Sequence, residues 1–315
     1  MTLENDNSLK SLTGAKQTML AWSKKIDSFE ELPEIYKDFF NDYLASHSSF
    51  PYIVLVPPMD KPMVRKTEKL IIDRGAAIQV IERSGSELIS KIFSYTSVRF
   101  LETGNILLYS WLLIKGVTTD GKENSSMIEF NPATGDSLLA PFLEKMRPAA
   151  REAEIVDFET EKAKFDYLSS SNFKLMNYGR NSLLRGETVR NVILQPEILK
   201  SAWQVLGWSF FPKMNTVHLT ILTDQELILI CEDERSPKVK GSRYGGTWQY
   251  IPLQGVSSAS LSGPVNGLFT LSFNFPGGET IQRQYAADCR PELEQLCSRI
   301  NQHNAERKSQ VPGRW

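Results

Sequence analysis

The stretch from His218 to Glu234, HLTILTDQELILICEDE, decides how this sequence of 315 residues is interpreted. It holds two apolar runs, HLTILT and ELILICED, on either side of a short polar break. Two such runs joined by polar residues are typical of a β-hairpin. We expect Leu219, Ile221, Leu227 and Leu229 to alternate onto one face of this hairpin. His218 then lies on a strand, where a structural or surface role is the simplest interpretation.

Similar patterns occur on both sides of the hairpin. Strands are predicted at 50–56, 69–73, 76–83, 88–102, 105–115 and 125–131, and again at 187–198, 203–211, 218–223, 226–233, 247–261, 267–275 and 279–286. Glycines at Asp73-Arg74-Gly75, Asp120-Gly121 and Pro276-Gly277-Gly278 supply the positive φ that tight turns need, and Gly245-Gly246 is assigned to a turn as well. The sequence is therefore mainly β.

Each set of strands is followed by one amphipathic helix. The first helix is predicted to begin at Asp136 or Ser137 and to end before Pro148. The second covers residues 291–304, with Leu293, Leu296, Cys297 and Ile300 along its buried face. The order of strands followed by a terminal helix thus occurs twice at nearly equal spacing, which indicates an internal duplication.

A small antiparallel barrel of seven strands with one C-terminal helix, present twice, resembles the pleckstrin-homology-like (PH-like) family, and its bacterial GRAM-like branch most closely. The segments that carry the resemblance are SLLRGETVRNVILQPEI, HLTILTDQELILICED and YIPLQGVSSASLSG with the final helix. The resemblance implies an α+β class, mainly β with helices, built as two PH-like barrels. It also implies that the opening hairpin forms strands three and four of the second barrel.

The rest of the chain is assigned around these barrels. Residues 1–49 form a helical N-terminal extension, with an amphipathic helix over 32–44 and a second short helix compatible with 15–26. The extension is expected to pack on the body of the protein, and a partner-binding helix is the alternative. The first PH-like domain covers 50–148, a helical and Ser-rich linker 149–177, the second PH-like domain 178–303, and a flexible tail 304–315. Helical propensity in the linker is expected to end at Ser169-Ser170-Ser171.

Composition restricts the function classes. Lys and Arg total 36 against 37 Asp and Glu, so the net charge of −1 gives no support to nucleic-acid binding. The three cysteines have no metal-ligand spacing, and an odd count argues against a disulfide scaffold, so a cytoplasmic location is expected. Neither a signal peptide nor a membrane-spanning run is recognised. The acidic cluster Glu232-Asp233-Glu234 is interpreted as a solvated loop of mixed charge. No cofactor, metal or catalytic motif is predicted.

Two segments are candidate binding sites. The segment MDKPMVRKTEKL contains four basic residues that form a candidate site for an anion or a lipid head group: Lys61, Arg65, Lys66 and Lys69. A solvated basic loop is the simpler interpretation of this segment. Aromatic residues in WQVLGWSFFP form a candidate interaction edge, with core packing as the simpler interpretation: Trp203, Trp208, Phe210 and Phe211.

The sequence therefore predicts a non-enzymatic interaction module that binds a protein or peptide partner. The alternative is a peripheral membrane protein that recognises anionic lipid through the first PH-like domain, possible only as weak binding because four basic residues contribute roughly 4 kcal/mol. An enzyme assembled from residues of both domains is the third hypothesis.

Overall fold

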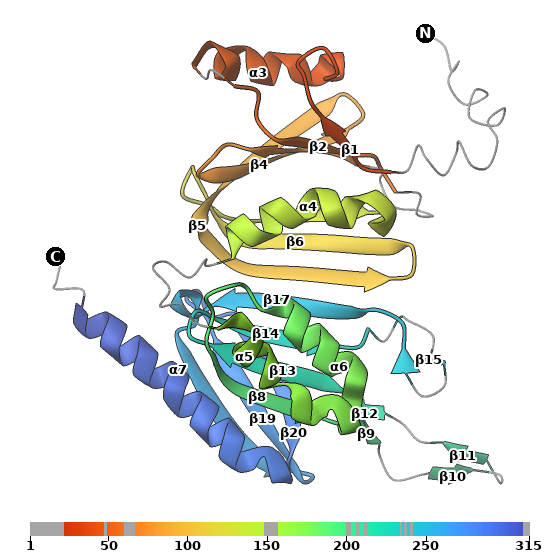
Figure 1. The fold of residues 1–315 in the computed structure, drawn as a ribbon, viewed down its shortest axis with the longest axis vertical. Coiled ribbons are helices and arrows are strands. Elements are labelled where there is room, and N and C mark those ends of the chain that lie inside the picture. The colour runs from red at the N-terminus through yellow and green to blue at the C-terminus, as the bar shows by residue number, and fades with distance from the viewer. Residues whose placement is uncertain are drawn as a thin grey trace. The chain divides into compact units, whose positions relative to one another are not determined.

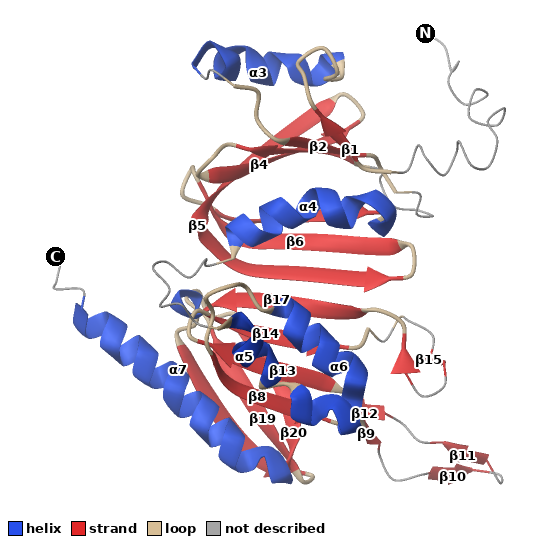
Figure 2. Cartoon of the chain, viewed as in Figure 1, coloured by secondary structure: helices blue, strands red, loops and turns tan. Residues whose placement is uncertain are grey.

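The computed structural model describes residues 22–46, 49–59, 67–147, 157–199, 203–205, 208–210, 213–233, 235, 238–239 and 242–310 (Figure 1). The chain divides into two compact units, one formed by Met1–Val98 with Asn105–Met146 and the other by Arg99–Gly104 with Arg147–Trp315. Strands dominate both units, their paired strands run antiparallel, and helices accompany them (Figure 2). The predicted class, mainly β with helices, is confirmed. None of the described helices is long and apolar enough to cross a membrane.

Seven strands belong to the first unit, β5 only in part: β1 (Lys24–Ile26), β2 (Ile53–Val56), β3 (Glu68–Asp73), β4 (Ala77–Ser84), β5 (Glu87–Ile106), β6 (Tyr109–Thr118) and β7 (Glu123–Phe130). Their order is β1-β2-β3-β4-β5, with β6 pairing β5 and β7. Six of these strands fall where the sequence predicts them. The exception is β1, which replaces the end of the short helix expected over 15–26.

Two helices accompany these strands. In the first, α3 (Glu34–Ser46), Tyr36 and Phe40 are fully buried and join a core with Ile53, Leu70 and Ile72, so the amphipathic helix packs on the sheet as expected. The second, α4 (Pro132–Met146), begins earlier than expected. The side chain of Asn131 accepts a hydrogen bond from the Ala133 amide at 2.9 Å, and Pro132 follows as the first helical residue, a favoured arrangement for starting a helix.

Two sheets build the second unit. One has the order β17-β14-β13-β8, and the other β18-β19-β20. Their strands are β8 (Val189–Gln195), β13 (His218–Thr223), β14 (Glu226–Cys231), β17 (Gly246–Pro252), β18 (Ser258–Val265), β19 (Leu268–Asn274) and β20 (Thr280–Ala286). A 3-10 turn at Leu253–Gly255 separates β17 from β18, so the single strand expected over 247–261 is two strands in different sheets. Another short turn, Ala287–Cys289, follows β20.

Short strand pairs and helices complete this unit. The strand pairs are β9 (Ile198–Leu199) with β12 (Lys213–Asn215), β10 (Trp203–Val205) with β11 (Trp208–Phe210), and β15 (Lys238–Val239) with β16 (Ser242–Arg243). The helices are α5 (Phe158–Ala163), the turn Asp166–Leu168, α6 (Ser169–Ser182) and α7 (Arg290–Gln310). The final helix therefore continues beyond the predicted end at 304. No sheet in the described part of either unit closes into a barrel, so the expected closed barrels are not observed.

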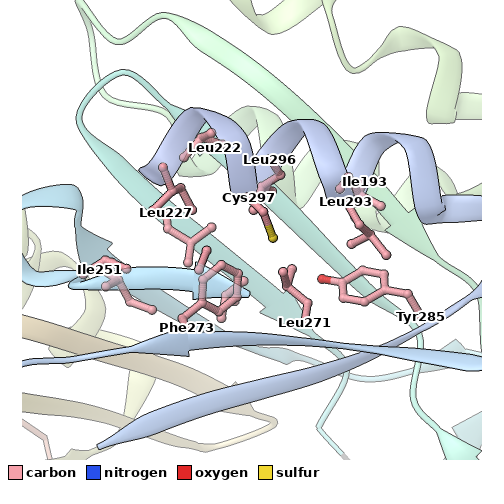
Figure 3. Packing of buried hydrophobic residues seen from close by; sticks show 14 of the residues in the cluster. Ile193, Leu222, Leu227, Ile251, Leu271, Phe273, Tyr285, Leu293, Leu296 and Cys297 are labelled. Carbon is pink, nitrogen blue, oxygen red and sulfur yellow. The ribbon is translucent and has the colours of Figure 1, made fainter. Parts of the chain in front are cut away.

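The core of the second unit lies between its two sheets and α7. Figure 3 shows Leu293, Leu296 and Cys297 of α7 directed toward residues of both sheets, among them Leu227 and Phe273. Leu271, Phe273, Leu293 and Leu296 are fully buried. The predicted apolar face of the last helix is therefore confirmed. Burial of such side chains stabilises the fold by about 1.5–3 kcal/mol each relative to exposure.

The opening hairpin has a different register from the expected one. Leu222 pairs with Leu227, Thr220 with Leu229 and His218 with Cys231. Directly paired residues of antiparallel strands share a face. One face of the hairpin therefore holds the side chains of residues 218, 220, 222, 227, 229 and 231. The other face holds Leu219 and Ile221. The grouping of all four leucine and isoleucine positions on one face was wrong, and the two strands are the second and third of their sheet rather than the third and fourth.

The opposite face of the hairpin is covered by α6. A side chain at Gly179 of α6 would come within 3.0 Å of Leu219, and Leu175 is fully buried. Both faces of β13 and β14 are thus covered, which explains why almost every residue in these strands is buried. Helical structure does not end at Ser169–Ser171 as predicted, because α6 begins at Ser169 and continues to Ser182 with a kink at Asn172. Asn172 has non-helical φ and ψ, and its side chain accepts a hydrogen bond from the Leu175 amide.

Candidate functional site

A cavity of about 590 Å³ lies in the second unit, at the end of the hairpin away from its turn. Its walls come from five main strands and the loop that follows β14. The lining residues are Thr216, His218, Cys231, Glu232, Asp233, Arg235, Thr247, Thr270, Gln282, Arg283 and Gln284. Nearly all of them are polar, in contrast to the apolar cluster deeper between the sheets. The volume lies within the range of about 300–1,000 Å³ that is usual for small-ligand pockets.

His218 is the most buried polar side chain in this wall, with 2% of its surface exposed. Its Nδ1 lies 2.9 Å from the carbonyl oxygen of Thr216, and its ring packs edge-on against Tyr285 with centroids 4.9 Å apart. Burial lowers the pKa of His218 to about 4, and the charge of Arg283 adds to the effect. The imidazole is therefore neutral at pH 7, with its proton on Nδ1, because only an N–H can bond a carbonyl oxygen.

The second ring nitrogen of His218, Nε2, is buried and has no hydrogen-bond partner in the described structure. Leaving a buried polar atom unpaired costs about 1–3 kcal/mol. Buried polar atoms are usually paired, so an unpaired one beside a cavity needs a cause. In the neutral tautomer this nitrogen is an acceptor, and a ligand that donates an N–H or O–H would satisfy it.

Arg283 supplies a positive charge to the same wall. Its guanidinium donates hydrogen bonds to the Gln249 side-chain oxygen at 2.7 Å and to the Gln282 carbonyl at 2.9 Å. Gln249 in turn donates to Glu102 at 2.9 Å. Both direct acceptors of Arg283 are neutral, and no carboxylate in the described part of the chain pairs with it. The network holds the guanidinium in place without neutralising its charge.

Two carboxylates of the wall are already paired. Glu232 and Asp233 are 8% and 7% exposed, so the interpretation of this segment as a solvated loop was wrong. Lys174 donates to Glu232 at 3.1 Å, and Arg235 donates two hydrogen bonds to Asp233 at 2.9 and 2.7 Å. Burial opposes the charge of Asp233, but the hydrogen bonds from Arg235 hold its pKa below the usual range. Asp233 therefore stays ionised, and both carboxylates have a structural role in ion pairs.

The loop after β14 returns to the sheet beside the cavity through two glycines. Gly245 has a φ of 71°, so its assignment to a turn is confirmed. Gly246 begins β17 instead, and a Cβ there would lie 3.0 Å from the carbonyl oxygen of Cys231. Its small size allows β17 to approach β14 closely at the rim of the cavity.

The cavity contains His, Cys, Glu and Asp side chains, which raises the question of a metal ion. Within the described ranges of the chain, no group of three or more such residues could hold one. The pairing of Glu232 with Lys174 and of Asp233 with Arg235 provides the physical reason, because a paired carboxylate is a poor ligand. Neutral hydrogen-bonding groups and one unmatched cation define the chemistry of this cavity.

A second cavity of about 380 Å³ lies near the other end of the hairpin. It is lined by residues of β8, β13 and α7, including Arg190, Arg299 and His303. The buried hydroxyl of Thr223 in this wall is already bonded to Glu187 and to the Glu226 backbone. This cavity offers basic side chains at the surface without an unsatisfied buried group, so it is the weaker candidate.

A buried ion-pair cluster lies at the turn end of the hairpin. The Arg147 guanidinium donates to Glu226 at 2.9 Å and to the Ser182 carbonyl at 2.6 Å, and it lies 4.0 Å from the Tyr250 ring centroid. Burial and the neighbouring Glu226 raise the pKa of Glu187 well above the ordinary carboxyl range. Two carboxylates and one arginine thus share this site, and none of the three lines either of the two cavities above.

The basic residues that the sequence singled out are only partly described. Lys61, Arg65 and Lys66 lie outside the described residues. Lys69 is on β3 with 7% of its surface exposed, and its ammonium donates to the Thr67 hydroxyl at 2.9 Å. Burial lowers the pKa of Lys69. This side chain is therefore poorly placed to reach a lipid head group, and a lipid site at the other three positions stays a prediction.

The local structure of the aromatic candidates also differs from the one expected from the sequence. Trp203 pairs with Phe210, and Val205 with Trp208, in a two-stranded hairpin. The single strand expected over 203–211 was wrong, and Phe211 lies outside the described residues. The hairpin belongs to neither main sheet of the second unit. An interaction edge at Trp203, Trp208 and Phe210 therefore stays a prediction.

Sequence reasoning did not select as a site the cavity residues His218 and Arg283, or Gln249, which accepts a hydrogen bond from Arg283. Their positions differ by up to 65 in the sequence, and the sheet pairing brings them together. One signal was present: a histidine, His218, in a strand that is otherwise mostly apolar. Compared with known protein families and with curated proteins, this sequence matches none.

Proposed function

We propose that this chain is a non-enzymatic binding protein with two PH-like units, and that the polar cavity of the second unit holds a segment of a protein or peptide partner. The strand order supports the fold assignment. In the second unit a sheet of four strands is followed by a sheet of three strands and a C-terminal helix. The first unit has the same order, with the long β5 pairing both β4 and β6 before α4.

One observation supports binding above all others: the buried, unpartnered Nε2 of His218 at the wall of the cavity. An unsatisfied acceptor on a residue of the cavity wall would be satisfied by a hydrogen-bond donor of a ligand. Both carboxylates beside it are held in ion pairs, which favours recognition over proton transfer. Backbone amides are abundant donors in any extended peptide, so a peptide segment suits this wall.

The lipid hypothesis has weaker support. It rests on basic residues of the first unit, and the described member of that set, Lys69, is buried and hydrogen-bonded. An exposed head group needs cations at the surface. The peptide-binding proposal is therefore preferred.

Selection from a random peptide library tests the proposal. We expect the full-length chain to enrich a related set of peptides, and the His218→Phe and Arg283→Gln variants to lose that enrichment. Val265→Ala is the matched control because Val265 is 70% exposed and lies away from the cavity wall. Each variant is first checked for a native melting profile. Absence of enrichment by the unmodified chain, or enrichment that persists in both cavity variants, would contradict the proposal.

A further inference from the structure

The charges around the cavity do not balance. Glu232 is matched by Lys174 and Asp233 by Arg235, whereas Arg283 is bonded only to neutral oxygens. Counted together with Lys174, which pairs with Glu232 from α6, the described wall holds three cations against two carboxylates, so one positive charge is in excess. A bound ligand with one negative charge would neutralise it, and a planar carboxylate matches the fork of a guanidinium well.

Arg283 and His218 face the same interior space. Arg283 pairs with Leu271 on the neighbouring strand, and Leu271 is a fully buried member of the core. Arg283 therefore shares the inward face with Leu271, and both Arg283 and His218 line the cavity. Tyr285, two positions along β20 from Arg283, packs against the His218 ring. The acceptor nitrogen and the unmatched cation are thus elements of one wall.

We propose that this cavity binds the carboxyl-terminal residue of a peptide, with the terminal carboxylate on Arg283 and the amide N–H of the same residue on Nε2 of His218. A terminal residue is suited to these two groups because its amide N–H is separated from its carboxylate by a single carbon. The inference rests on the proposed function, and it adds the chemistry of the segment that is bound.

A phosphate group fits the wall less well. At neutral pH a phosphate monoester carries a charge of about −1.5 to −2. After pairing with Arg283 it would leave negative charge close to the buried carboxylates of Glu232 and Asp233. A low local dielectric strengthens that repulsion. A carboxylate leaves the cavity neutral, so it is the preferred anion.

The test compares end groups on the peptides that the library selection yields. Each peptide is made with a free carboxyl terminus and with a terminal amide, and its Kd for the full-length chain is measured by calorimetry. We expect amidation to weaken binding by roughly tenfold or more, the size of one lost charge-assisted hydrogen bond. Arg283→Gln should weaken the free-acid peptide by a similar factor and leave the amidated peptide nearly unchanged.

Arg299→Gln is the matched control, because it removes the same charge from α7 at the second cavity. It should change neither Kd. Peptides that bind equally well with free and amidated ends would overturn this inference and leave the proposed function intact.

A panel of N-acetylated amino acids separates the two possible sources of the carboxylate. If these bind in an Arg283-dependent way while no peptide does, the ligand chemistry holds and the proposed peptide partner is wrong. If neither binds, both are wrong.

Discussion

The inward side chains of the β13–β14 hairpin are apolar at one end and mostly polar at the other. At the turn end, Leu222 and Leu227 pair with each other and pack in the core beneath α7. At the other end, His218 and Cys231 pair with each other at the wall of the polar cavity. Thr220 lies between the two and bonds the Tyr285 hydroxyl. One face of one hairpin thus changes from apolar to polar over five residues.

The neighbouring strand shows the same change. Ile251, Gln249 and Thr247 of β17 pair with Leu227, Leu229 and Cys231 of β14, so β17 also becomes polar toward the cavity. Sequences normally fill inward positions with apolar residues, and departures from that rule concentrate at functional sites. The turn end is therefore expected to determine stability, and the cavity end to determine binding. The predictions below test this division, beginning with the largest effect.

Replacing Arg147 should cause the largest loss of stability. Arg147→Met leaves Glu226 buried without its cation, and Glu226 Oε2 already has no partner in the described structure. Removing one member of a buried ion pair costs about 3–5 kcal/mol. Denaturant unfolding should show this loss. The matched control is Lys162→Met, which removes a partly exposed cation from α5 and should cost less than about 1 kcal/mol. Equal losses of unfolding free energy in the two variants would contradict the assignment of Arg147 to a buried ion pair that stabilises the turn end.

A packing defect in the core at the turn end should cause the second-largest loss of stability. Leu296 of α7 is fully buried, so Leu296→Ala should lower the unfolding free energy by about 2–5 kcal/mol. Val265→Ala, at a position 70% exposed, should change it by less than about 0.5 kcal/mol. Peptide affinity measured on the folded fraction should stay unchanged for Leu296→Ala. A specific loss of affinity would show that the two ends are not independent.

The cavity end should have its own dependence on pH. The folded-state pKa of His218 is about 4, below the ordinary value of 6.5. The unfolded chain therefore binds the proton more readily, and the stability associated with neutral His218 is lost as pH falls from about 6.5 to about 4. A difference of this size corresponds to about 3 kcal/mol at most. In His218→Phe this part of the acid destabilisation should disappear.

At the turn end, stability is expected to change with pH in the opposite direction. The pKa of Glu187 is raised to about 8, so the stability associated with its protonated form is lost as pH rises from the ordinary carboxyl range through about 8. Glu187→Gln should flatten the alkaline side of the stability curve and leave the acid side unchanged. Denaturant unfolding across pH measures both variants. If both variants flatten the same side, the assignment of one titrating group to each end is wrong.

The sequence predicted most strands of both units because their apolar runs are bounded by clear turns, as at Gly75 and at Gly277-Gly278. It did not predict the hairpin register, since both faces of β13 and β14 are buried and simple alternation no longer separates them. Burial by α6 on one face and by the second sheet on the other is a tertiary effect. The cavity was missed for the same reason: His218 and Arg283 line one cavity only after the two sheets pack, and the local pattern does not show which distant residues come together.

The smallest effect is expected at Cys297, a residue of α7 that faces the core with 9% of its surface exposed. Burial raises the pKa of its thiol to about 11, so the sulfur stays protonated and unreactive at neutral pH. Cys297→Ala removes one small buried group and should cost about 1 kcal/mol, while peptide affinity stays unchanged. Cys289, which is half-buried, provides the comparison. A thiol-reactive reagent should modify Cys289 in the folded chain and Cys297 only at the rate of unfolding. Rapid modification of Cys297 in the folded chain would show that the core beneath α7 opens, which would contradict the assignment of stability to this core.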